Sequence, residues 1–263
     1  LLHPKELPVA IYEPNRSFAE LSVEMDLKAK TLESLVNFLE DRNINIVTGV
    51  IIGNLREGKR ILETFIDYTD SGLSIDEITQ QIMSLEGVFN VEYVSQLKEG
   101  LAVCKLHFPP KVLGEKAVIF RKTILESVIK RLGGLFKTGL DTMLYEAGLE
   151  TGRVAAKTFK KAFGLEGKAL IDFMLGLGLS LGWGKFELVE LDEGRHMLTL
   201  RARELFECEI FREVRGEGPT SYFVKGHILG AAREIFNDEK LTVAETKCIA
   251  SGDPYCEFQI KPA

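Results

Sequence analysis

Near its C-terminus the chain reads Ala244-Glu-Thr-Lys-Cys-Ile-Ala-Ser-Gly-Asp-Pro-Tyr-Cys-Glu-Phe258. The turn-forming residues Ser251-Gly-Asp-Pro254 lie within this stretch and predict two short strands joined by a turn. In such a hairpin Cys248 and Cys256 lie opposite each other, and the side chains of paired strands are about 5 Å apart. Glu245 stands three residues before Cys248. The stretch therefore predicts two thiols and one carboxylate gathered on an antiparallel sheet.

Three interpretations of these residues are open. Two thiols and a carboxylate suit a tetrahedral zinc site. A cross-strand disulfide between Cys248 and Cys256 suits the same arrangement where geometry and redox conditions allow it. The third interpretation is a pair of free thiols in the core. Seven residues separate the two cysteines, which is longer than the spacing of ordinary zinc knuckles, so the spacing does not choose between them.

The pattern Glu-x-x-Cys-x-x-x-Gly-x-x-x-Cys and the glycine-rich helix Gly226-His-Ile-Leu-Gly230 before it resemble the 4-vinyl-reductase-type domain. Two more stretches are similar to that family, Leu144-Tyr-Glu-Ala-Gly-Leu-Glu-Thr-Gly152 and Gly182-Trp-Gly184. The resemblance covers about residues 113–263. It implies a small-molecule-binding module of the kind found in archaeal proteins, in a bacteriochlorophyll-synthesis protein and in the sensory domains of aromatic-responsive activators.

The resemblance also implies a metal site. In zinc-binding relatives a further cysteine begins the helix before the Gly-x-x-x-Gly motif, and Ser221 or Tyr222 stands at that place in this chain. Zinc is the expected cofactor, with a fourth position left for water, Cys208 or His227. The ligands that we expect are Glu245, Cys248 and Cys256.

Relatives enclose a mostly hydrophobic pocket beside the metal hairpin, and the resemblance implies a small apolar or aromatic ligand here. We expect the pocket to be lined by Phe173, Met174, Leu177, Trp183, Phe223 and His227. Simpler interpretations exist for some residues. His227 and Trp183 are also typical of a packed core, and Cys208, on an expected strand over 206–214, is typical of a buried apolar filler.

The C-terminal half predicts an α+β domain, with helices segregated from an antiparallel sheet. Helices are expected over 117–132, where Gly133 and Gly134 end the first one, over 137–163 and 222–236, and in the apolar run 169–184, where a buried helix runs into a glycine-rich turn. Strands are expected over 185–191, 196–203 and 206–214, followed by the cysteine hairpin. Glycines at positions 148 and 152 fall inside the long helix and predict close packing against another helix, because glycine otherwise weakens a helix by about 1 kcal/mol.

The N-terminal half predicts a ferredoxin-like βαββαβ domain. Its expected strands cover 18–25, 44–52, 61–68 and 88–94, with a further strand over 101–108, and its helices begin near residues 31 and 74. Ser74-Ile-Asp-Glu77 is a capping box. The segment Glu86-Gly-Val-Phe-Asn-Val-Glu92, entering the last strand of that order, resembles an ACT-type regulatory domain. The glycine-rich turn of that family is replaced by Met25-Asp-Leu-Lys-Ala-Lys30, which favours a packing or dimerisation module over an amino-acid-binding one.

The length of 263 residues exceeds that of most single domains. We expect an extended arm over 1–17 without a core of its own, an ACT-like domain over 18–110 and a 4-vinyl-reductase-type domain over 113–263. A net charge of −6 argues against direct nucleic-acid binding. The apolar run 169–184 contains Asp172 and is too short to span a membrane. Four cysteines and no signal peptide favour a cytoplasmic location. A first residue other than Met leaves room for an upstream extension.

We find no nucleotide-binding or hydrolase motif in the sequence. The expected function is therefore non-enzymatic: a regulatory protein that binds a small hydrophobic molecule. The alternatives are an assembly role, since the resembled fold is shared with Bet-type subunits of the TRAPP vesicle-tethering complex, and an enzymatic role related to tetrapyrrole vinyl reduction. We expect a homodimer, because the glycine-punctuated helix and the edge of an ACT-type sheet are surfaces that commonly find partners.

Overall fold

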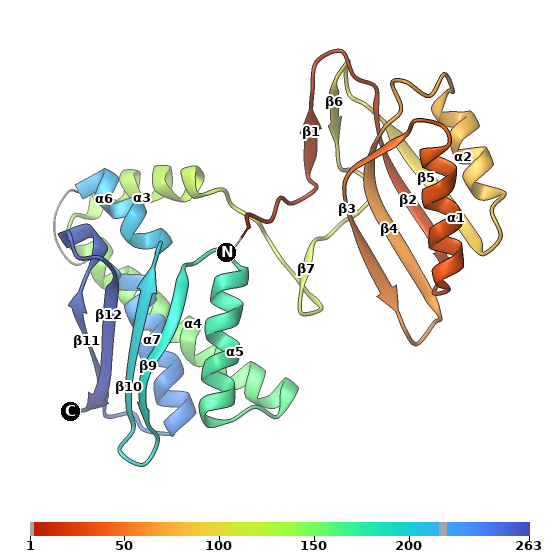
Figure 1. Cartoon of the computed structure of the whole chain (residues 1–263). Coiled ribbons are helices and arrows are strands. Elements are labelled where there is room, and N and C mark those ends of the chain that lie inside the picture. The colour runs from red at the N-terminus through yellow and green to blue at the C-terminus, as the bar shows by residue number, and fades with distance from the viewer. Residues whose placement is uncertain (1–2, 216–219) are drawn as a thin grey trace. The chain divides into compact units, whose positions relative to one another are not determined.

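The computed structural model describes residues 3–215 and 220–263 and divides the chain into two compact units, Leu1–Val118 and Ile119–Ala263 (Figure 1). The first two residues of the expected arm lie outside the described part. Among the described residues, none of the helices combines the length and the apolar character that crossing a bilayer requires.

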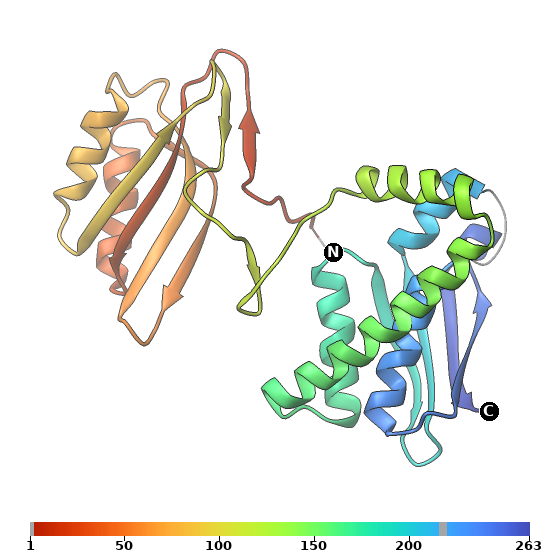
Figure 2. The same cartoon turned by 180° about the vertical axis from the view of Figure 1, so that it is seen from behind.

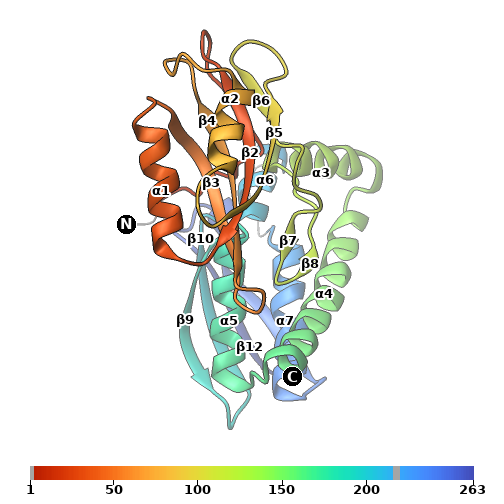
Figure 3. The same cartoon turned by 90° about the vertical axis from the view of Figure 1, so that its right-hand side faces the viewer.

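The N-terminal unit contains the expected βαββαβ order. Its sheet has the strand order β3-β4-β2-β5, and both helices lie on one face of it (Figure 1 and Figure 3). The elements are β2 (Phe18–Asp26), α1 (Ala29–Glu40), β3 (Asn45–Asn54), β4 (Lys59–Asp67), α2 (Ile75–Met83) and β5 (Val88–Ser95). Apolar side chains of β2 alternate toward the helices, where Leu21, Val23 and Met25 are buried. The ferredoxin-like arrangement is confirmed.

The expected capping box begins α2. The Ser74 hydroxyl accepts a hydrogen bond from the Glu77 amide at 3.3 Å, and the Glu77 carboxylate accepts one from the Ser74 amide at 2.8 Å. Two backbone donors of the first turn are thus satisfied reciprocally, which fixes where the helix starts.

The arm contributes a strand that the sequence pattern did not predict. β1 (Ala10–Tyr12) pairs antiparallel with β6 (Leu101–Val103) on the face of the sheet opposite the helices (Figure 1). The expected strand over 101–108 is thus wrong in its length and does not join the main sheet. Beyond Val103 the amides of Lys105 and Leu106 donate to the buried carboxylate of Glu20 and not to the carbonyl groups of a neighbouring strand. The short hairpin β7 (Lys111–Val112) and β8 (Glu115–Lys116) follows.

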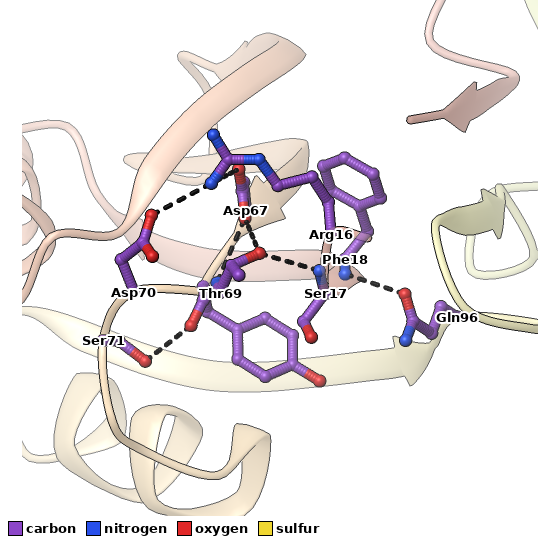
Figure 4. Close-up of polar contacts among 9 residues, drawn as sticks. Arg16, Ser17, Phe18, Asp67, Thr69, Asp70, Ser71 and Gln96 are labelled. Carbon is purple, nitrogen blue, oxygen red and sulfur yellow. Dashed lines mark hydrogen bonds and ion pairs between the residues drawn. The ribbon is translucent and has the colours of Figure 1, made fainter. Parts of the chain in front are cut away.

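Polar contacts tie the end of the arm to the loop after β4 (Figure 4). A guanidinium nitrogen of Arg16 lies 2.9 Å from the Asp70 carboxylate and 3.4 Å from that of Asp67. The amide of Ser17 donates to the Thr69 hydroxyl at 2.8 Å, and that hydroxyl donates to Asp67 at 2.6 Å. The arm is therefore anchored to the sheet through both charge and backbone hydrogen bonds.

The C-terminal unit packs helices on one face of a four-stranded sheet, as Figure 2 shows from behind. The strand order is β11-β12-β10-β9, with all neighbours antiparallel. The helices are α3 (Lys122–Phe136), α4 (Gly139–Phe163), α5 (Gly167–Ser180), α6 (Phe206–Arg215) and α7 (Tyr222–Phe236), and the strands are β9 (Lys185–Asp192), β10 (Met197–Arg203), β11 (Leu241–Lys247) and β12 (Cys256–Pro262). α5 and α7 lie on the sheet, and α4 packs on α7 (Figure 3). The α+β class is confirmed.

Two expectations for this unit were wrong. The segment 206–214 is the helix α6, not a strand, because its buried residues 207, 208, 210 and 211 do not alternate as in a strand but recur at the spacing of one helix face. The first helix was expected over 117–132, but α3 begins at Lys122 and continues through both glycines to Phe136. At Gly134 an added side chain would meet no atom within 4 Å, so this glycine neither ends the helix nor makes a close contact.

Close packing of α4 on α7 explains the glycines inside both helices. A Cβ atom added at Gly148 or Gly152 would lie 2.0 Å from a carbonyl oxygen of α7. Gly226 and Gly230 of α7 face α4 in the same way, at 2.2 and 1.9 Å. The expected helix contact is confirmed. It also removes one reason for expecting a dimer, because the glycine surface of α4 is already used within the unit.

Candidate ligand cavity and thiol cluster

Three cysteines and one glutamate meet at the end of the C-terminal sheet. Glu245 lies in β11, Cys248 directly follows that strand, Cys256 begins β12, and Cys208 comes from α6. One ligand atom from each of the four residues lies within 4.8 Å of all the others. The Cys208 sulfur is 3.3 Å from that of Cys256 and 3.6 Å from that of Cys248. We call these four residues the thiol cluster.

The hairpin places its cysteines nearly as the spacing predicts. Lys247 and Glu257 are the last paired residues of β11 and β12, so Cys248 and Cys256 follow that pair directly. The connection is longer than a simple turn and contains a short 3-10 helix over Ile249–Ser251, followed by Gly252 at a φ of 95°. The amide of Cys248 donates to Asp253 at 2.8 Å, which holds the loop closed. No disulfide joins Cys248 and Cys256 in the structure.

Ser221, where relatives have a cysteine, also reaches the thiol cluster. Its hydroxyl lies 2.9 Å from the Cys208 sulfur and donates to Glu245 at 2.8 Å. The position is fully buried at the start of α7. Cys208 therefore brings into the cluster the third thiol that Ser221 does not provide. His227, the other candidate for the fourth position, is not part of the cluster.

Burial makes the thiol cluster electrostatically unusual. Burial raises the pKa of Glu245 to about 8, and the neighbouring Cys248 acts in the same direction. Hydrogen bonds from Cys208 and Cys256 lower the pKa of Cys248, so this sulfur is the one that carries negative charge most readily. The second carboxylate oxygen of Glu245 is buried without a hydrogen-bond partner. Such a group is costly unless a cation or a proton satisfies it.

The donor set fits a tetrahedral metal ion. Ligands at the zinc–sulfur distance of about 2.3 Å around a tetrahedral centre lie about 3.8 Å from one another. The two sulfur–sulfur distances of 3.3 and 3.6 Å are about 0.5 and 0.2 Å shorter than that value. Three thiols, one carboxylate and an unsatisfied carboxylate oxygen make the thiol cluster a candidate metal site. Zinc bound there would join α6 to the β11–β12 hairpin and neutralise the charge that burial penalises.

Glu207, next to Cys208 in α6, was not identified from the sequence. Its carboxylate is 1% exposed and accepts hydrogen bonds from the amides of Phe223 and Val224 at 2.7 and 2.8 Å. It therefore caps α7 from another helix. Burial raises the pKa of Glu207 to about 8 despite these two hydrogen bonds. The sequence around Glu207 would read the same if its carboxylate were on the surface, so no sequence pattern indicates that Glu207 caps α7.

A cavity of about 210 Å³ lies between α4, α5, α7 and the sheet. Four of the six residues expected to line a pocket do so: Met174, Leu177, Trp183 and His227. The other two do not. The centroid of the Phe173 ring lies 5.1 and 5.3 Å from those of Phe159 and Phe163, and the Phe223 ring packs edge to face with that of Trp183, with the centroids 5.7 Å apart.

Most of the remaining lining was not expected from the sequence. It includes Ala155 and Phe159 of α4, Phe186, Leu198 and Leu200 of the sheet, and Val224, Ile228 and Ala231 of α7. The alternation of apolar residues in β10 indicates a buried face, but it does not distinguish side chains that bound a cavity from side chains that fill a core.

His227 provides the main polar group of the cavity. Its ring meets that of Trp183 edge to face, with the centroids 4.9 Å apart. Burial lowers the pKa of His227 to about 4, so the imidazole is neutral near pH 7. All the other lining residues have apolar side chains except Trp183, whose indole carries one N–H group. The cavity therefore suits an uncharged, largely apolar molecule.

Comparison with known families covers the region that contains the thiol cluster. Residues 203–262 match the model of the 4-vinyl-reductase-type domain. This segment runs from the end of β10 through α6 and α7 to β12, and it includes every residue of the thiol cluster as well as His227. The resemblance of the C-terminal half to this family is thereby confirmed.

One curated protein and several solved structures are also similar to this chain. An uncharacterised protein of Methanocaldococcus jannaschii is 26% identical over 157 residues, which are 59% of this chain and 82% of the relative. The phenol-responsive sensory domain of the transcription activator PoxR, solved with phenol, is similar in fold: it aligns with 90% of this chain and 92% of its own, with 13% identity and a TM-score of 0.50. An ACT domain from the GTP pyrophosphokinase of Chlorobium tepidum aligns with 30% of this chain and 99% of its own, with 20% identity and a TM-score of 0.25.

Proposed function

We propose that this chain is a non-enzymatic regulatory protein whose C-terminal unit binds a small apolar or aromatic molecule in the cavity between α4, α5, α7 and the sheet. The observation that carries the proposal is the cavity itself, which has about 210 Å³ of space and an almost entirely apolar lining. An apolar cavity of about 150 Å³ is large enough to bind benzene. The fold shared with a sensory domain solved with phenol supports the same conclusion.

The chemistry of the lining favours binding over catalysis. Among the described residues that line the cavity there is no carboxylate, thiol or hydroxyl side chain, and the one imidazole is held neutral by burial. A general acid or base with a partner to orient it is the usual minimum for catalysis of proton transfer. A ligand enclosed here contacts α5, α7 and the sheet at the same time, which is a suitable input for regulation.

Cavity filling tests this proposal. Ala155 lines the cavity, whereas Ala147 lies on the exposed side of the same helix, so Ala155→Leu and Ala147→Leu form a matched pair. Calorimetric titration with toluene, phenol and indole is expected to show binding by the wild type and by Ala147→Leu. Ala155→Leu is expected to weaken the affinity at least tenfold. Failure of all three compounds to bind the wild type, or equal binding by Ala155→Leu, would refute the proposal.

We further propose that the thiol cluster holds one zinc ion through Cys208, Glu245, Cys248 and Cys256. Sulfur distances near those of a tetrahedral site support this, as does the unsatisfied oxygen of Glu245. The ion has a structural role in this proposal, because four protein ligands leave no open position for substrate. Chelation is expected to lower the thermal stability of the C-terminal unit. Unchanged melting after complete removal of bound zinc would contradict that role.

A further inference from the structure

The helix α3 has large apolar side chains that are exposed. It packs on α6 and α4 (Figure 1), yet no residue of α3, which the structure describes throughout, is buried. On one side of the helix Leu125 and Ile129 are half-buried. Beside them Ile124, Val128 and Leu135 follow one another at helical spacing, and all three are exposed. The apolar stripe of α3 is therefore wider than the part that its neighbours cover.

Exposed apolar side chains continue beyond the regular part of this stripe. Ile119 and Phe120 precede the helix, and Phe136 is its last residue. The group is large for a surface that contacts only water, and patches of this kind commonly mark an interaction site. We call the six exposed apolar side chains the α3 surface: Ile119, Phe120, Ile124, Val128, Leu135 and Phe136.

The same segment is basic in an otherwise acidic chain. Residues 119–137 contain five Lys or Arg and one Glu, a net charge of +4 (5 − 1), which leaves −10 for the rest of the chain (−6 − 4). Lys130 and Arg131 are exposed on α3. Arg131 follows Val128 by three residues, so the guanidinium group is next to the apolar side chains. A basic amphipathic helix is typical of contact with an anionic membrane surface or with an acidic partner protein.

The geometry favours a membrane surface over the other occupants. A protein groove that binds an amphipathic helix has walls on both sides of it, whereas α3 already packs on α6 and α4 along one side. A second copy docked through the same surface would bring two segments with a charge of +4 together. A layer of anionic headgroups meets only the exposed side of α3, where it takes up apolar side chains and attracts basic ones.

We propose that the α3 surface binds the headgroup region of an anionic lipid bilayer, as a peripheral contact that does not span the membrane. The exposed apolar side chains enter the layer between headgroups and acyl chains, and Lys130 and Arg131 pair with lipid phosphates. The inference is independent of the ligand cavity and of the thiol cluster. Residues 119–137, all of which the structure describes, include none that lines the cavity or belongs to the cluster.

Co-sedimentation of the whole protein with lipid vesicles tests this proposal. The wild type is expected to bind vesicles made of equal parts phosphatidylglycerol and phosphatidylcholine. Binding to vesicles of phosphatidylcholine alone is expected to be weaker by about tenfold or more, because the basic residues then lose their partners. Added salt is expected to release the protein, since it screens the attraction between charges. Equal binding to both kinds of vesicle, or binding to neither, would overturn the proposal.

Two matched pairs of variants locate the contact. Val128 on α3 and Val154 on α4 are 48 and 51% exposed, and Lys130 and Lys157 are exposed on the same two helices. Lys130→Glu is expected to weaken binding to anionic vesicles by about fivefold or more, the contribution of one basic residue near an anionic surface. Val128→Ser is expected to weaken it about threefold, because the exposed half of the side chain no longer gains from leaving water. Val154→Ser and Lys157→Glu are expected to bind as the wild type does, and equal weakening by these controls would overturn the assignment to α3.

Light scattering distinguishes a second copy from lipid as the occupant. The proposal expects Val128→Glu to lose binding to anionic vesicles while its molar mass in solution stays that of the wild type. A wild-type dimer that Val128→Glu converts to a monomer, together with no binding of the wild type to vesicles, would assign the α3 surface to self-association and overturn the proposal. Thermal melts of each variant, followed by the fluorescence of Trp183 in the same unit, check that the fold is retained.

Discussion

Replacing Gly152 with alanine is expected to destabilise the C-terminal unit by about 2–3 kcal/mol. The new Cβ atom would lie 2.0 Å from the carbonyl oxygen of His227 and 2.9 Å from the amide nitrogen of Ala231. Ordinary contact begins at 3.4 Å, so α4 and α7 would have to separate by about 1.4 Å (3.4 − 2.0) at this point. Both atoms belong to the backbone and cannot move aside as a flexible side chain does.

The magnitude follows from two opposing effects. Overpacking of a tight interface costs about 1–3 kcal/mol and more when backbone has to shift, so we take about 3–4 kcal/mol for this site. Replacing glycine with alanine inside a helix stabilises the helix by about 1 kcal/mol, because alanine has the higher helix propensity. Gly176 in α5 is the matched control, because a Cβ there meets no atom within 4 Å. Gly176→Ala is expected to stabilise the unit by about 0.5–1 kcal/mol.

Urea unfolding followed by tryptophan fluorescence measures this directly. Trp183 is the single tryptophan of the chain and lies in the C-terminal unit, so its emission reports that unit alone. The two variants are expected to shift the midpoint in opposite directions. A Gly152→Ala protein as stable as the wild type, or a shift of the same sign in both variants, would refute the close backbone contact between α4 and α7.

Three further predictions concern the metal, pH and assembly. Natively purified protein is expected to contain one zinc ion per chain. Cys208→Ser is expected to lose most of this zinc, whereas Cys104→Ser is expected to keep it. A metal-free wild type whose thiols resist alkylation until reduced would favour a disulfide instead. The pKa of His227 is lowered to about 4 in the folded protein, so the unfolded chain binds more protons between about pH 6.5 and 4. Stability should fall as the pH drops through that window, and thermal melts of His227→Phe should show a weaker fall. The apolar, exposed edge strand β3 predicts a homodimer, which a monomeric mass by light scattering at high micromolar concentration would disprove.

Local sequence was sufficient wherever the signal is carried by neighbours in the chain. The capping box at Ser74 and Glu77 predicted the start of α2, and the turn residues around Gly252 predicted the hairpin that brings Cys248 close to Cys256. Local signals failed where two patterns overlap. In 206–214 alternating charges resemble a strand, yet the buried positions follow a helix, because burial against α7 and the hairpin decides which face is apolar.

The sequence by itself determined the two-part organisation, the βαββαβ order of the first half, the family resemblance of the second, and three of the four residues of the thiol cluster. Only the tertiary structure placed Cys208 beside them, put Thr151 against His227, and left a cavity where a core was equally compatible with the pattern. The physical reason is the sequence separation over which each kind of interaction acts. Periodicity and turn chemistry act over a few residues, whereas these contacts join positions 40 and 76 residues apart, and packing alone decides whether apolar faces meet or leave space.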